Sequence, residues 1–163
     1  MIKLSALTLA LVAAVTFVAT SAQAQSPRFI KGPTGSLDTT SGDYCVAFKE
    51  AGLGNTPVTY TITAQATFTF QCFTRNGNQP QGAPNSVSFS DFSTQTTLTP
   101  RNGQITGSLC LMPEQGAAAC QGNGLVLKLI AVDYQNVTFC DSTNNVCAAT
   151  GSQSATLPRP ITF

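Results

Sequence analysis

The sequence predicts an all-β protein: a single-domain antiparallel β-sandwich of about seven or eight strands, immunoglobulin-like, with a closed β-barrel as the alternative. Two observations predict this fold class. A long stretch in the middle of the chain alternates apolar and polar residues with a period of two, which is typical of a strand with one buried face. The rest of the chain is rich in turn residues and poor in charge, with 13 Gly, 9 Pro and 9% charged residues.

The clearest strand is predicted at residues 57–73. Its apolar residues, Tyr60 and Phe68 among them, share one parity, and Thr or Gln fills most of the other. This alternation directs one face to the core and the other to solvent. Because the run is long for a single strand, we expect a bend where the small residues Ala64 and Ala66 allow it.

Further strands are predicted at residues 43–49, 86–98, 104–112, 125–134, 136–141 and 145–150, with a last one at 155–163. The strand at 125–134 is apolar on both faces, which favours a central position. The apolar parity shifts between Phe89 and Phe92, which predicts a β-bulge. Turn residues at 100–103 predict a hairpin of strands 86–98 and 104–112, and the Gly, Pro, Gln and Asn of residues 76–85 predict a long loop.

The first 24 residues predict an export signal that is removed. Met1-Ile2-Lys3 is a basic start, an apolar run follows to about Ala19, and Ala22-Gln23-Ala24 has the small-x-small pattern at which signal peptidases cut. The apolar run is too short and too poorly flanked for a retained membrane helix. We therefore expect residues 25–163 to form one secreted domain, periplasmic in a Gram-negative cell, with no membrane segment after signal removal.

Composition excludes several classes of function. Outside the signal the chain has seven basic and seven acidic side chains, since Lys3 is the only charged residue removed. A neutral chain without charge runs lacks the basic stripe that phosphate binding needs, so nucleic acid is not an expected partner. The absence of histidine excludes Ser-His-Asp and Cys-His catalysis and histidine zinc sites. No cofactor and no metal site are predicted.

The chain has six cysteines, an even number that predicts three disulfides in an exported protein. They are Cys45, Cys72, Cys110, Cys120, Cys140 and Cys147, and none forms a C-x-x-C pair. Cys140 and Cys147 would face each other across a hairpin, close enough to bond. Cys45 and Cys110 fall on the polar faces of their strands, where they could bridge neighbours.

Cys72 and Cys120 then remain, so the residues favour the pairs Cys45–Cys110, Cys72–Cys120 and Cys140–Cys147. The alternative pairs Cys110 with Cys120 locally and leaves Cys45 for Cys72. Both sets place every cysteine in a disulfide.

The stretch GDYCVAFKEAGLG, residues 42–54, resembles a stretch in small secreted bacterial β-rich proteins, common in actinomycetes, whose function is uncharacterised. The order of later features is similar too, and the resemblance covers about residues 35–140. It implies the pair Cys72–Cys120, because the relatives carry matching cysteines. The other four cysteines stand where the relatives usually have Thr or another small residue. The resemblance implies no activity, substrate or catalytic residue.

We expect a protein that binds, or acts at a surface, without catalysis; no catalytic, cofactor-binding or metal-ligating residue is predicted, and the partner is not identified. One alternative is a small extracellular hydrolase with paired carboxylates, as in glycosidases, for which Asp133 and Asp141 are the candidates. A second is a secreted effector or adhesin-like subunit, which an exposed apolar patch would support. Two carboxyls facing one cleft would favour the hydrolase, and dispersed acids would favour binding.

Two further segments have simple structural explanations. Asp141-Ser142-Thr143-Asn144-Asn145 offers oxygen atoms to calcium but lacks the acidic spacing of a calcium loop, so we expect a hairpin turn. The Thr face of residues 59–69 invites a role in ice binding or adsorption. Thr is also a favoured residue on the solvent face of strands, and we expect no more than that here.

Overall fold

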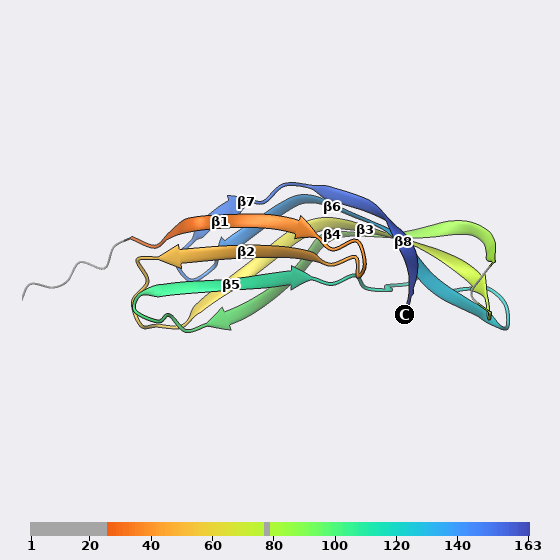
Figure 1. Ribbon diagram of the computed structural model, residues 1–163, viewed down its shortest axis with the longest axis horizontal. Helices are drawn as coiled ribbons and strands as arrows, with labels where there is room; N and C mark the ends of the chain where they lie inside the picture. Colours follow the sequence, from red (N-terminus) through yellow and green to blue (C-terminus); the bar gives the residue numbers. More distant parts are fainter. Residues whose placement is uncertain (1–25, 77–78) are drawn as a thin grey trace, which may run out of the picture.

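The computed structural model describes residues 26–76 and 79–163, so the predicted signal at 1–24 lies outside the described residues. Eight strands form two antiparallel sheets that pack face to face (Figure 1). In chain order the strands are β1 (Arg28–Leu37), β2 (Tyr44–Ala51), β3 (Val58–Thr74), β4 (Pro80–Leu98), β5 (Gln104–Leu111), β6 (Leu125–Asp141), β7 (Val146–Ala149) and β8 (Gln153–Thr162).

The smaller sheet has the order β1-β2-β5, and the larger has β4-β3-β6, with both β7 and β8 paired to β6. β7 pairs with the end of β6, and β8 pairs with its beginning. Both sheets keep free edges in the described part of the chain, so the closed barrel is wrong. The predicted single-domain antiparallel β-sandwich is confirmed.

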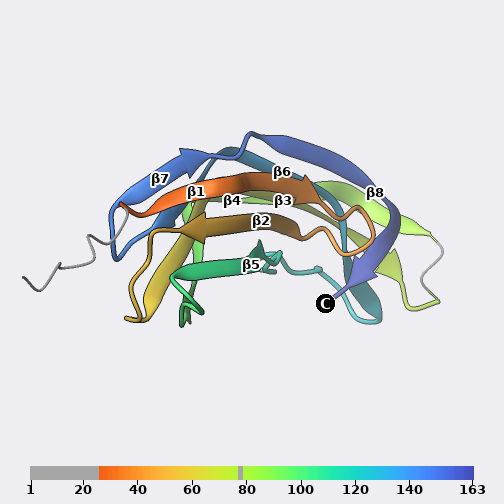
Figure 2. The same cartoon turned by 60° about the vertical axis from the view of Figure 1, so that its left-hand side comes forward.

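The core confirms the alternation of the long central strand. Tyr60, Ile62, Phe68 and Phe70 are fully buried between the sheets, whereas the Thr residues between them face outward. Each fully buried side chain of this size stabilises the fold by about 1.5–3 kcal/mol. The predicted bend is present as register shifts near Ala64 toward both neighbouring strands. The larger sheet is arched along its strands (Figure 2).

The predicted hairpin of 86–98 with 104–112 is wrong. β4 belongs to the larger sheet, and β5 pairs with β2 in the smaller one. The tight turn exists, with reciprocal backbone hydrogen bonds between Arg101 and Gln104, but its Gly103 carbonyl accepts from Leu53 N–H at 3.1 Å. The turn therefore carries the chain from one sheet to the other, because turn residues specify a reversal and not the partner of the strand that follows.

Two further expectations need correction, and one strand was missed. The long loop at 76–85 is wrong, because β3 and β4 pair as far as Phe73 and Pro80, and Gln71 Nε2 donates to the carbonyls of Gln81 and Gly82. The strands predicted at 125–134 and 136–141 are one strand, β6, which passes through Asn136 at a φ of 54°. The strand β1 was not predicted at all.

The larger sheet extends beyond the smaller one (Figure 1), and the chain after β5 covers part of the face left open. Ala118 of that segment is buried, and Gly116 lies against the side chains of Val87 and Phe89. The Cys72–Cys120 disulfide ties the segment to β3. The segment after β5, held by this disulfide, thus covers part of the larger sheet where no strand of the smaller sheet lies.

All three favoured disulfides are present: Cys45–Cys110, Cys72–Cys120 and Cys140–Cys147. Cys45 and Cys110 are register partners of β2 and β5, as Cys140 and Cys147 are of β6 and β7, so the alternative pairing is wrong. Three disulfides indicate an oxidising environment of the extracellular type. The described residues include no helix long and apolar enough to cross a membrane.

Substitution of Gly35 by Ala should destabilise the fold by about 2–3 kcal/mol through overpacking. A Cβ at Gly35 would overlap the buried Tyr44 hydroxyl, which donates to the Gly151 carbonyl at 2.8 Å and so ties β2 to the β7–β8 connection. Urea unfolding measures the loss. Gly54→Ala is the control, because a Cβ at Gly54 meets no atom within 4 Å. Equal stability of the two variants would contradict this reading of the Tyr44 contact.

Candidate functional site

The carboxylate pair considered for a hydrolase does not form. Asp133 and Asp141 lie on the one continuous strand β6, eight residues apart, which separates them by roughly 25 Å at the rise of an extended strand. The sequence predicted two separate strands here, at 125–134 and 136–141, and the one strand β6 that replaces them holds the two carboxyls apart. The Asp133 carboxylate instead accepts a hydrogen bond from the side-chain amide of Gln135 at the exposed surface of the strand.

Asp141 meets a different carboxyl, that of Glu50, in the interior between the two sheets. Both side chains are fully buried. Tyr60 Oη donates to Glu50 Oε2 at 2.8 Å, and Glu50 Oε1 has no donor. The sequence did carry a signal for this burial, because Glu50 shares the inward parity of Tyr44, Val46 and Phe48.

Burial raises the pKa of Glu50 to about 7, against a smaller lowering by the Tyr60 hydrogen bond. The charge of Asp141 raises the pKa further. Glu50 is therefore mostly protonated below about pH 7 in the folded protein. With both side chains buried, the pair lies within the core and not at the surface.

Both carboxylate oxygens of Asp141 hold the hairpin turn that follows β6. Oδ1 accepts from the backbone N–H groups of Thr143 and Asn144, both at 2.9 Å, and Oδ2 accepts from Asn144 Nδ2. These bonds explain the oxygen-rich segment 141–145 as the hairpin turn expected from the sequence.

The Thr face of the larger sheet is present and continues onto β4. Thr59 bonds to Thr97, and Thr67 bonds to Ser88, each at 2.9 Å between hydroxyl oxygens. These hydroxyls satisfy one another across the strands. The face is therefore a polar solvent surface with its hydrogen bonds largely made within the sheet.

The smaller sheet presents a different outer surface, which we call the basic face: the outward side chains of β1, β2 and β5. Arg28 stands opposite Ala51 and Lys31 stands opposite Lys49, and register partners share a face of the sheet. None of the outward residues on these three strands is acidic. In the part of the chain that the structure describes, neither lysine forms an ion pair.

The basic face is hollowed between its two lysines. The hollow has a volume of about 600 Å³. Its lining residues are Lys31, Thr34, Ala47, Phe48, Lys49, Thr106 and Gly107. Ala47, with only one methyl group, leaves space on the outer face. Gly107 contributes backbone only, because a Cβ at Gly107 would point inward, 3.5 Å from the Phe48 ring.

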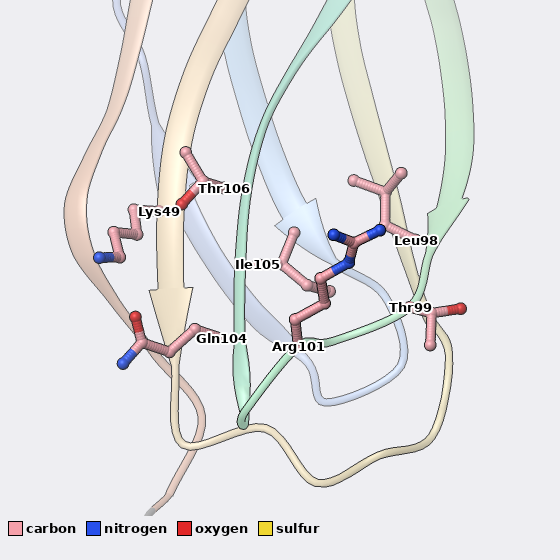
Figure 3. Close-up of a pocket in the computed structure, with 7 residues that line it drawn as sticks. All are labelled: Lys49, Leu98, Thr99, Arg101, Gln104, Ile105 and Thr106. Carbon is pink, nitrogen blue, oxygen red and sulfur yellow. The ribbon is translucent and has the colours of Figure 1, made fainter.

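A second hollow, of about 460 Å³, continues the first, because Lys49 and Thr106 line both. Figure 3 shows Lys49, Gln104 and Thr106 on one side of the β5 ribbon and Arg101 on the other, beside Leu98. The second hollow thus leads around the β5 edge to a further cation. The sequence alone could not show the first hollow, because Lys31 lies on the strand that was not predicted.

We compared the chain with protein-family models and with curated proteins. No family model matches the chain, and no curated protein matches it. The resemblance to secreted actinomycete-type proteins stays a prediction.

Proposed function

We propose that this chain is a secreted, disulfide-stabilised protein that works by binding at a surface and not by catalysis. The observation that carries the proposal is the placement of its carboxyls. Among the described residues, the acids that meet, Glu50 and Asp141, are sealed in the core. The two hollows of the basic face are lined by cations, hydroxyls, an amide and apolar groups, and by no carboxylate. Another hollow, beside Met112, has one carboxyl in its lining, that of Glu114. A glycosidase needs two carboxyls at one cleft that admits substrate.

The disulfides support the same proposal, because a binding surface is best built on rigid elements. Cys45–Cys110 crosses β2 and β5 on the basic face itself, at directly opposed residues. This bond fixes the register that sets Lys49 against Thr106. The face that carries the hollows is therefore held covalently as well as by its backbone ladder.

A screen of the purified exported protein against glycans and bacterial cell surfaces tests this function. We expect retention on at least one of these surfaces with no degradation of the bound material. Hydrolysis of any polymer in the screen would contradict the proposal, and Glu50→Gln would then show whether the buried pair takes part.

A further inference from the structure

We propose that the basic face binds an acidic polysaccharide, with one anionic sugar seated in the hollow between Lys31 and Lys49. This inference rests on the proposed binding function and names its partner. It follows from the charge of the face, from the shape of the hollow, and from the second hollow that continues it.

Charge is unevenly distributed over a neutral molecule. Of the seven cations outside the signal, Arg28, Lys31 and Lys49 lie on the basic face, and Arg101 lies at its β5 edge. The exposed acids are elsewhere, in the 38–43 connection, on β4, after β5 and on β6. Such a segregated field attracts a polyanion at short range.

The hollow has the composition that suits a charged sugar. Its volume lies in the range of about 300–1,000 Å³ that small-molecule sites occupy. Ala47 and Gly107 provide a small apolar floor against which the C–H groups of a sugar ring can lie. The two lysines reach from neighbouring strands toward a carboxylate or sulfate, and the hydroxyls of Thr34 and Thr106 can bond to ring hydroxyls.

The second hollow favours a polymer over a single sugar. A chain that leaves the first hollow past Lys49 and Thr106 reaches Gln104 and then Arg101. Nucleic acid fits less well, because tight binding uses roughly 6–10 phosphate contacts, whereas this face offers four cations. The hollows also hold no aromatic platform open to base stacking, since Phe48 is buried in the core.

The test measures the affinity of the exported protein for two polyanions, heparin and polygalacturonate, with neutral dextran and duplex DNA as comparison ligands. We expect binding to at least one polyanion that weakens as salt is added, no binding to dextran, and weaker binding to DNA. The double charge reversal Lys31→Glu with Lys49→Glu should lower the polyanion affinity at least tenfold. The matched control, Arg75→Glu with Arg159→Glu, makes the same charge change away from the basic face and should change affinity less than twofold.

The double variant Lys31→Gln with Lys49→Gln tests whether loss of binding comes from misfolding, because it removes both charges with a smaller perturbation. It should also weaken binding, and its thermal unfolding should match that of the parent protein. Equal affinity of parent and reversal variant would overturn the inference, and so would DNA binding as tight as polysaccharide binding. Retention on neutral glycans alone would overturn it while leaving the proposed function intact. Failure to bind any surface in the wider screen would instead overturn the proposed function.

Discussion

The free energy of unfolding should fall by up to about 3 kcal/mol as the pH rises from about 4.5 to about 7, and then level off. Burial and Asp141 raise the pKa of Glu50 from 4.5 to about 7 in the folded protein. Over that window the folded state holds a proton that the unfolded state has released, so acidification stabilises the fold. Asp38, whose pKa is lowered by hydrogen bonds from Thr40, acts in the opposite direction but only below its usual value of 3.8.

Glu50→Gln should abolish most of this pH dependence. The amide is a neutral isostere: its oxygen can accept from Tyr60, and its NH₂ can donate to Asp141. Urea unfolding at pH 5 and pH 8 measures the slope, and at pH 8 the variant should be at least as stable as the parent. Glu114→Gln, at an exposed position after β5, is the control and should keep the parental slope. A slope unchanged in Glu50→Gln would show that Glu50 is not the source of the pH dependence.

Removal of the Cys72–Cys120 bond should cost about 4 kcal/mol, against about 2 kcal/mol for the Cys140–Cys147 bond. The first closes a loop with a sequence separation of 48 and the second a loop of 7, so the first restricts the unfolded chain far more. The first also holds the segment that covers Val87 and Phe89. Urea unfolding of the two double Cys→Ala variants under non-reducing conditions measures both losses.

Equal losses in the two double variants would contradict this difference. Hydrogen exchange separates the local effect from the global one. Without Cys72–Cys120, amides near Ala118 should lose protection first, whereas those of β2 should keep theirs. Uniform loss of protection would show that the disulfide stabilises the protein only by restricting the unfolded chain, and not by holding this segment in place.

The parts of this fold that sequence reasoning predicted are those decided by local geometry. A period of two fixed which side of β3 is buried, and the positions of Cys45 and Cys110 along their strands gave their pairing. Partner choice between strands is not local. The turn at 100–103 could not show that β5 leaves β4 for β2, because that choice depends on packing between the sheets.

Edge strands were the hardest to find. The first half of β4 has its residues 80–86 exposed on both faces, so it lacks the alternation that marks a half-buried strand. In β1, Gly32 and Pro33 interrupt the pattern, with one register shift across them and another just before Lys31. The lysine pair of the basic face was missed because Lys31 lies on β1. The burial of Glu50 could be predicted from the parity of its strand. Its proximity to Asp141 could be seen only in the folded chain.

The measurement that tests the central claim most directly is an amide chemical-shift titration of the ¹⁵N-labelled exported protein with a short acidic oligosaccharide. We predict shifts concentrated at Lys31, Ala47, Lys49, Thr106 and Gly107, saturating together and weakening with added salt. Shifts gathered on the Thr face of β3, or no shifts at all, would contradict binding through the basic face.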